Sequence, residues 1–222
     1  MMIEQIKGAI FDMDGTLVDS LWQWEVIWKE FGDRFLNGAT FRPSEEVDKA
    51  VRTMTLKDTM DYLHEVCQIG ESGAQLLQIT NELIKGFYEN EVELKQGVRE
   101  FLEYCKKSGI KMCVASATRL DFVRLAMKHC EIEHYFCDVL SCADIGKGKE
   151  EPDIFLLAQE RLGTKTEETC VFEDSLVAIC TAHKAGMKTV AIYDRYNYGQ
   201  EEMQQIADVY IKEGETLEKL YL

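Results

Sequence analysis

Hydrophobic and polar positions follow two different rhythms along this chain. From Leu21 to about Glu93, apolar residues recur at steps of three and four, as in Trp24, Ile27 and Phe31. That spacing predicts amphipathic helices. The same stretch shows no run with the short, β-branched pattern that is typical of a strand. We therefore predict that residues 21–93 form an all-helical segment.

Capping residues mark where helices begin inside this segment. Ser44 and Thr55 each stand before a first turn that carries acidic residues, which is a typical helix start. The helix after Thr55 is expected to end at Gly70, and another is expected from about residue 72 to residue 88. These signals divide the segment into several helices of moderate length.

The second pattern consists of short apolar runs, which are found on both sides of the helical segment. Most of the runs after residue 97 alternate with helical patterns, which predicts an α/β fold with a doubly wound parallel sheet. The first run precedes the helical segment, so we expect a core of residues 1–20 and 94–222 with an inserted cap, residues 21–93. The predicted strands are 8–11, 112–115, 139–142, 169–172, 189–192 and 208–211.

Two acidic residues directly follow the first predicted strand. Asp12 and Asp14 are two positions apart, so continued strand geometry would place them on one face, and Gly15 permits a tight turn after them. Like charges beside an apolar strand are costly to desolvate unless a cation or a proton relieves them, which favours a hard divalent metal. An acidic turn without chemistry is the plain alternative. An EF-hand calcium loop does not fit, because Gln23 stands where the closing Glu belongs.

Further polar residues gather at the ends of other predicted strands. Ser116 and Thr118 follow the second strand, Glu173 and Asp174 follow the strand at 169–172, and Lys149 lies in a loop between a strand and a helix. Each has an ordinary explanation when taken alone, as a helix cap, a charged turn or a surface lysine. Ligands of open α/β sheets bind outside the carboxyl ends of the strands, so the set as a whole favours a functional site.

Composition limits the partners of the chain. A net charge of −15 disfavours nucleic acid or an anionic membrane surface, so a phosphorylated substrate would need local attraction by metal, lysine and backbone N–H groups. The sequence shows neither a signal-peptide layout nor a membrane span, and its eight cysteines form no C-x-x-C pair. We expect a cytoplasmic protein with reduced thiols.

Four ordered motifs give the chain a family resemblance. The motifs are Asp12-x-Asp14-Gly15-Thr16, Ser116 after a hydrophobic strand, Lys149-x-x-Pro152-Asp153-x-Phe155, and Phe172-Glu173-Asp174-Ser175. With these motifs the chain resembles the haloacid dehalogenase (HAD) superfamily of phosphohydrolases, in the branch that contains β-phosphoglucomutase and small-metabolite phosphatases. The resemblance implies a Rossmann-like core with a helical cap.

The resemblance also implies a reaction and a role for each site residue. It implies a Mg²⁺-dependent phosphatase that hydrolyses a small phosphorylated metabolite through an aspartyl-phosphate, with Asp12 as nucleophile and Asp14 as general acid and base. Asp12, Asp14 (through its carbonyl) and Asp174 would form the metal site, with help from Glu173. The implied phosphate-binding residues are Asp12, Met13, Asp14, Ser116, Ala117 and Lys149.

The resemblance leaves other activities open. A sugar phosphomutase of the β-phosphoglucomutase type is the first alternative. Trp24 stands where that mutase has a histidine, and Leu56 stands where it has the arginine that grips the second phosphate, although Arg52 or Lys57 could replace that arginine. We therefore predict a phosphatase. An inactive HAD-fold binding protein is the second alternative; the sequence leaves the oligomeric state open, with a monomer expected.

Overall fold

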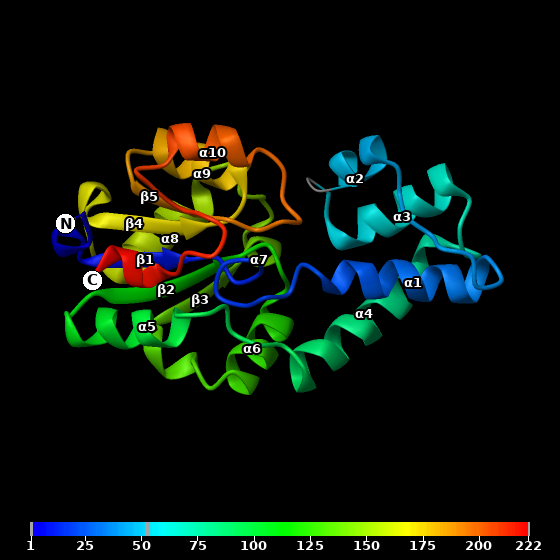
Figure 1. The fold of residues 1–222 in the computed structure, drawn as a ribbon, viewed down its shortest axis with the longest axis horizontal. Coiled ribbons are helices and arrows are strands. Elements are labelled where there is room, and N and C mark those ends of the chain that lie inside the picture. Colours follow the sequence, from blue (N-terminus) through cyan, green and yellow to red (C-terminus); the bar gives the residue numbers. More distant parts are fainter. Residues whose placement is uncertain (1, 52–53, 222) are drawn as a thin grey trace. The chain divides into compact units, whose positions relative to one another are not determined.

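A parallel β-sheet organises the larger of two compact units of the protein, which a computed structural model describes for residues 2–51 and 54–221 (Figure 1). The strand order is β3-β2-β1-β4-β5-β6, and every neighbouring pair is parallel. This confirms the predicted fold class, and each strand lies within one residue of its predicted bounds. The strands are β1 (Gly8–Phe11), β2 (Lys111–Ser116), β3 (Asp138–Ser141), β4 (Thr169–Glu173), β5 (Lys188–Ile192) and β6 (Val209–Ile211).

Helices cover both faces of this sheet, which explains why the inner residues of its strands are mostly apolar. Successive side chains of a strand point to opposite faces. Ile10 therefore packs in one cluster with Phe155 and Ala182, while Phe11 stacks on Phe172 with ring centroids 4.5 Å apart. The helices are α5 (Val98–Lys107), α6 (Leu120–His129), α7 (Cys142–Ile145), α8 (Asp153–Leu162), α9 (Leu176–Lys184) and α10 (Gln200–Ile206).

The described chain divides into two compact units. The sheet unit takes the residues up to Leu21 and those from Val92 onward, and the second unit is Trp22–Glu91. All regular elements described in the second unit are helical. Its buried cluster includes Ile27, Phe31 and Leu63. Its helices are α1 (Gln23–Phe35), α2 (Glu45–Val51), α3 (Leu56–Cys67) and α4 (Gly73–Asn90).

Local caps explain where the helices of the second unit begin. The Thr55 hydroxyl accepts a hydrogen bond from the Asp58 N–H at 3.2 Å, as the sequence predicts, and the Ser72 hydroxyl accepts one from the Gln75 N–H at 3.2 Å. The predicted end of α3 at Gly70 is wrong. The helix ends at Cys67 because Gln68 takes the left-handed conformation, with φ of 54°, and its side-chain amide donates back to the Glu65 carbonyl at 2.6 Å.

Three further findings complete the fold. Cys142, predicted as the last residue of a strand, begins α7 instead, and α10 has no counterpart in the sequence prediction. All eight cysteines are free. Among the described residues, no helix combines the length and the apolar character that crossing a bilayer demands.

Candidate active site

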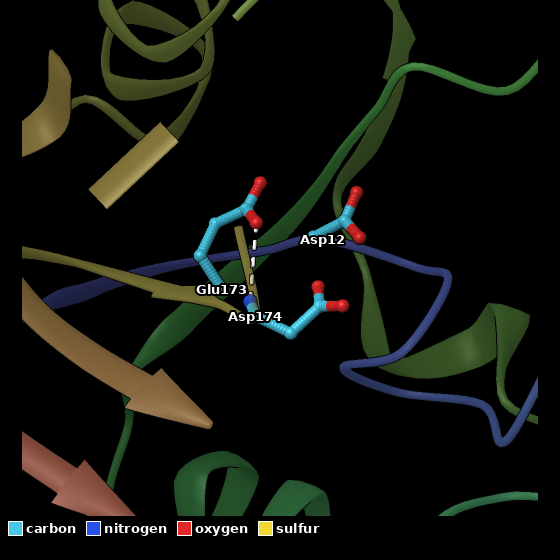
Figure 2. Close-up of side chains that lie close together, drawn as sticks. All are labelled: Asp12, Glu173 and Asp174. Carbon is cyan, nitrogen blue, oxygen red and sulfur yellow. Dashed lines mark hydrogen bonds between the residues drawn. The ribbon is translucent and has the colours of Figure 1, made fainter. Parts of the chain in front are cut away.

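Three carboxylates meet where β1 and β4 end. Asp12 follows β1, Glu173 is the last residue of β4, and Asp174 follows it. Because β1 and β4 are neighbours, with the Asp12 N–H donating to the Phe172 carbonyl at 3.0 Å, their carboxyl ends bring these side chains together. One oxygen from each of the three lies within 4.8 Å of the other two, and Figure 2 shows the carboxyl groups facing a common space. All three side chains are buried.

Burial makes this acid cluster unfavourable without a positive charge nearby. Desolvation raises the pKa of Asp12 to about 7, and repulsion from Glu173 and Asp14 adds to it, while Lys149 opposes it. Desolvation also raises the pKa of Asp174 well above its usual value, with repulsion from Asp12 and Glu173 adding to the effect. Buried carboxylate oxygens this close together fit a hard divalent cation, which would stabilise their ionised forms.

Lys149 supplies one positive charge to the cluster from the loop between α7 and α8. Its Nζ donates to Oδ1 of Asp12 and to Oε1 of Glu173. Burial alone would lower the pKa of Lys149, but the two carboxylates outweigh burial and raise it, so the side chain stays a cation. The predicted convergence of Asp12, Lys149, Glu173 and Asp174 is present in the structure.

Glu173 also anchors the start of helix α9. Its Oε2 accepts hydrogen bonds from the backbone N–H groups of Asp174 and Ser175, both at 3.1 Å. Its Oε1 accepts the Lys149 ammonium. Both oxygens thus have donors already, and the use of Glu173 as a metal ligand stays a prediction.

Asp14 lies apart from the three-acid cluster. Its Oδ1 accepts the Ser20 hydroxyl at 2.7 Å and its Oδ2 accepts the Thr118 hydroxyl at 2.8 Å. Strand geometry does not continue past Phe11, since the residues after it form a turn in which the N–H of Gly15 donates to the Val18 carbonyl at 2.9 Å. The strand therefore does not extend to Asp12 and Asp14, and these two residues do not share a strand face as predicted.

The other predicted phosphate-binding residues lie on the neighbouring turns. Ser116 is the last residue of β2, and its buried hydroxyl accepts the N–H of Thr118 at 3.0 Å. Ala117 follows it and is exposed. Met13 follows Asp12 with its side chain fully buried, so its backbone is the part that a ligand could contact. The phosphate-binding roles of these residues stay predictions.

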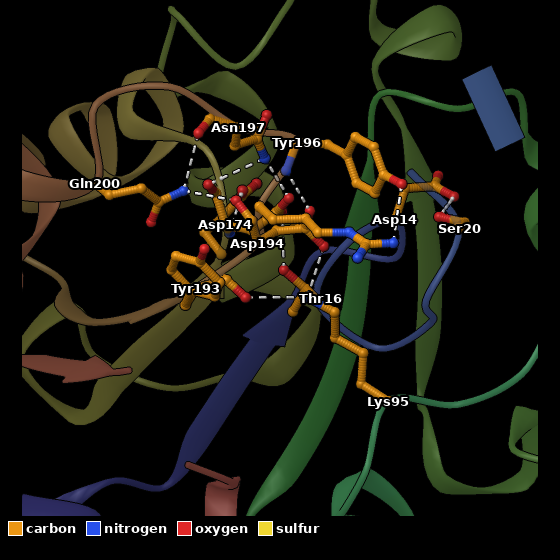
Figure 3. A network of polar contacts seen from close by, with 12 residues as sticks. Asp14, Thr16, Ser20, Lys95, Asp174, Tyr193, Asp194, Tyr196, Asn197 and Gln200 are labelled. Carbon is orange, nitrogen blue, oxygen red and sulfur yellow. Dashed lines mark hydrogen bonds and ion pairs between the residues drawn. The ribbon is translucent and has the colours of Figure 1, made fainter. Parts of the chain in front are cut away.

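Two residues outside the predicted site fix Asp174. The Thr16 hydroxyl donates to its Oδ1 at 3.0 Å, and the Asn197 side-chain amide donates to its Oδ2 at 2.5 Å. Figure 3 shows both beside Asp174 within a larger polar network. Thr16 belongs to the first motif, although no role at this carboxylate was predicted for it. Asn197 belongs to no motif. The sequence could have indicated it only through its position in the loop after the predicted strand β5, because ligands bind near the carboxyl ends of such strands.

The close approach of the Asp174 side chain requires a glycine at position 15. Gly15 has φ of +76°, and a Cβ on it would lie 2.1 Å from Oδ2 of Asp174. We expect Gly15→Ala to displace this carboxylate and, if the acid cluster holds a divalent cation, to weaken the binding of that cation by roughly 10- to 100-fold, the usual cost of disturbing the support of a metal ligand. Titration calorimetry with Mg²⁺ measures the change.

Gly214→Ala is the matched control for this substitution. Gly214 has φ of +78°, and a Cβ at that position would meet nothing within 4 Å among the described residues beyond its chain neighbours. Both variants therefore carry similar backbone strain, and only Gly15→Ala carries the collision. Equal Mg²⁺ affinities in the two variants would contradict the role given to Gly15.

Comparison with known proteins places the chain in a family. Residues 9–192 match the haloacid dehalogenase-like hydrolase family. The chain belongs to this family. The HAD-like chain is 28% identical over 217 residues to the phosphorylated carbohydrates phosphatase of Thermotoga maritima, covering 97% of this chain and 98% of that protein. It is 25% identical over 202 residues to the fructose-1-phosphate phosphatase of Escherichia coli, covering 86% and 98%.

A solved structure supports the same placement of this HAD-like protein. A crystal structure from Thermotoga maritima, assigned provisionally as a β-phosphoglucomutase, matches with a TM-score of 0.78 and 25% identity, covering 97% of this chain and 98% of the other. The resemblance predicted from the four motifs is therefore confirmed. Family membership makes the protein a hydrolase, and its buried acid cluster is of the kind that holds a divalent metal.

Proposed function

We propose that this protein is a Mg²⁺-dependent phosphatase that hydrolyses a small phosphorylated metabolite through an aspartyl-phosphate on Asp12. The observation that carries the proposal is the meeting of Asp12, Glu173, Asp174 and Lys149 at the carboxyl ends of adjacent strands. A surface acidic turn would not bury three carboxylates around one lysine, because the cost of desolvation would have no compensation.

The residues divide the chemistry of a phosphate ester between them. An oxygen of Asp12 attacks the phosphorus, and the bond from phosphorus to the ester oxygen breaks. Asp14, in its protonated form, gives the leaving alcohol its proton. Water then attacks the phosphorus of the aspartyl-phosphate while Asp14 takes a proton from it, which releases inorganic phosphate and restores Asp12. General acid and base catalysis of this kind contributes about 10²–10⁴-fold.

Positive charge makes the approach of the two anions possible. Lys149 contacts Asp12, and we propose that it also contacts phosphoryl oxygens of the bound substrate. The Ser116 hydroxyl and the backbone N–H groups at Met13 and Ala117 are proposed to bind the remaining phosphoryl oxygens. A Mg²⁺ ion held by Asp12, Asp174 and the Asp14 carbonyl would supply further charge neutralisation. Glu173 holds Lys149 in place from the other side.

Named relatives support a phosphorylated sugar as the class of substrate. The Thermotoga maritima relative is a phosphorylated carbohydrates phosphatase, and the Escherichia coli relative is a fructose-1-phosphate phosphatase. The chain covers nearly the whole length of both. We propose a sugar phosphate or a similar small ester as the substrate.

A sugar phosphomutase is the second candidate, favoured by the likeness to the structure assigned provisionally as a β-phosphoglucomutase. Two observations weigh against it. Trp24, at the position of the mutase histidine, has an indole N–H that can donate a hydrogen bond but no basic nitrogen that could accept a proton, and it packs against Trp28 at 5.1 Å between ring centroids. Leu56, at the position of the arginine, is the first residue of α3 and cannot pair with a phosphate. Arg52 and Thr53 lie outside the described residues.

The experiment that tests the proposal measures phosphate release from a panel of sugar phosphates, phosphoglycolate and nucleotides, in Mg²⁺ and in EDTA. We expect Mg²⁺-dependent release from at least one sugar phosphate. In parallel, β-glucose 1-phosphate with a trace of the 1,6-bisphosphate is assayed for glucose 6-phosphate. Isomerisation without phosphate release would establish the mutase instead, and inactivity on the whole panel would favour a binding protein.

A further inference from the structure

We propose that Asn197 is a positioning residue that sets the Mg²⁺ affinity of the acid cluster, and that the part-buried Lys95–Asp194 ion pair holds the loop that carries Asn197. This inference deepens the proposed function and rests on it for the identity of the cation. Neither Asn197 nor the ion pair belongs to the motifs of the sequence, and the proposed mechanism uses neither.

Asn197 contacts Asp174 twice. Its Nδ2 donates to Oδ2 of the carboxylate at 2.5 Å and to the backbone carbonyl of the same residue at 3.1 Å. Only the NH₂ end of the amide can donate to both acceptors, so the contacts define which way the side chain points. Thr16 donates to the other carboxylate oxygen. A donor on each oxygen therefore fixes the orientation of the Asp174 carboxylate toward a cation.

The loop that carries Asn197 is itself fixed by side chains. Asp194 is only 5% exposed, and its Oδ1 accepts the N–H of Tyr196 at 2.9 Å. The Gln200 amide donates to the carbonyl of Asp194 at 2.8 Å and to that of Asn197 at 3.1 Å. The Tyr210 hydroxyl donates to Gln200 Oε1 at 2.7 Å. Figure 3 shows part of this network beside Asp174.

Lys95 connects this loop to the loop after β1. Its Nζ donates to Oδ2 of Asp194 at 2.8 Å and to the backbone carbonyl of the preceding residue at 3.2 Å, while its own N–H donates to the Leu17 carbonyl at 3.0 Å. The loop after β1 carries Thr16, and the loop after β5 carries Asn197. One residue therefore braces the two loops that supply the donors on Asp174.

This brace explains how Asp174 can stay in place despite its burial among like charges. A carboxylate repelled by Asp12 and Glu173 would otherwise turn away, and restoring it on cation binding would cost conformational entropy. Outer partners that orient a ligand typically contribute 10- to 100-fold to metal affinity. We expect an effect of that size from Asn197.

The test uses Asn197→Ala and Asn197→Leu, because leucine keeps the approximate size of asparagine and its branching at Cγ but has no hydrogen-bond donor. Titration calorimetry without substrate should show the Kd for Mg²⁺ raised about 10- to 100-fold in both variants. At saturating Mg²⁺ we expect kcat within about threefold of the parent enzyme. Asn90→Ala is the matched control, since Asn90 is exposed and its amide donates to the Gly86 carbonyl in α4.

A second variant tests the ion pair. Asp194→Asn removes the charge that faces Lys95 and should also raise the Kd for Mg²⁺. Combined with Asn197→Ala, it should add little, because both changes loosen the same carboxylate. Fully additive effects would overturn the route from the ion pair through Asn197.

The outcomes separate this inference from the proposed function. An unchanged Kd in both Asn197 variants would overturn the inference while the parent enzyme still binds Mg²⁺ and releases phosphate. A parent enzyme that binds no Mg²⁺ would overturn the inference together with the metal dependence of the proposed function. A raised Kd in Asn197→Ala alone would overturn the donor role, because it would assign the effect to volume.

Discussion

Asp12→Asn is expected to reduce phosphate release at least about 10⁴-fold, the largest effect of any single substitution, as is typical for loss of a covalent nucleophile. An amide is a poor nucleophile and forms no acyl-phosphate at a useful rate. Folding should be kept, because the neutral amide removes repulsion with Glu173 and Asp174 at a buried position and Lys149 keeps its contact with Glu173. Steady-state release of phosphate in saturating Mg²⁺, with the melting temperature recorded beside it, measures both effects.

Asp33→Asn is the matched control for this variant. Asp33 lies on α1, is exposed and pairs with Lys29 one helical turn away, so the same chemical change there should leave turnover unaltered. Residual activity of Asp12→Asn above one part in about 100 would contradict the proposed nucleophile, or would indicate a contaminating phosphatase.

Lys149→Met is expected to lower kcat/KM about 10²–10³-fold, the usual cost of losing one electrostatic contact to a developing charge. It should also destabilise the protein in EDTA by about 3–5 kcal/mol, because a buried ion pair loses one partner and leaves Asp12 and Glu173 unpaired. For a chain of this length, about 2–4 °C of melting temperature corresponds to each kcal/mol. Thermal unfolding with and without Mg²⁺ separates the two effects, since the cation should restore part of the stability.

Lys147→Met provides the comparison in the same loop. Lys147 is exposed and pairs with Asp153 at 2.7 Å, so its loss should change neither turnover nor melting temperature appreciably. Adding Glu173→Gln to Lys149→Met should recover stability without recovering turnover. Recovery of turnover in the double variant would place the role of Lys149 outside the reaction.

The parts of the molecule that were predictable are those whose signal is local. The run Gly8–Phe11 is apolar because it is covered on both faces, and its bounds could be predicted without error. The joint position of Asp12 and Asp174 followed from one rule, that polar residues at the carboxyl ends of parallel strands share an edge, whereas Lys149 joins them from the loop between α7 and α8. Neighbouring strand ends bring together residues far apart in the sequence, as in Asp12 after β1 and Asp174 after β4.

The parts that were missed depend on contacts that leave little trace in the sequence. Helix α10 is polar except for a few positions, with Met203 as its one buried residue, so it lacks an apolar stripe. Gln68 takes a left-handed conformation that the neighbouring Gly70 would have been expected to supply. Asn197 and Lys95 resemble ordinary surface residues until the fold places them against Asp174 and Asp194.

The central position of β1 has a consequence for how the protein is made. β1 leaves the ribosome first, but its partner β2 begins at Lys111 and its other partner β4 begins at Thr169. During translation Asp12 is therefore exposed long before Lys149, Glu173 and Asp174 have been made. Trp22–Glu91 forms a compact unit of its own, and all of its residues are translated before either strand that pairs with β1.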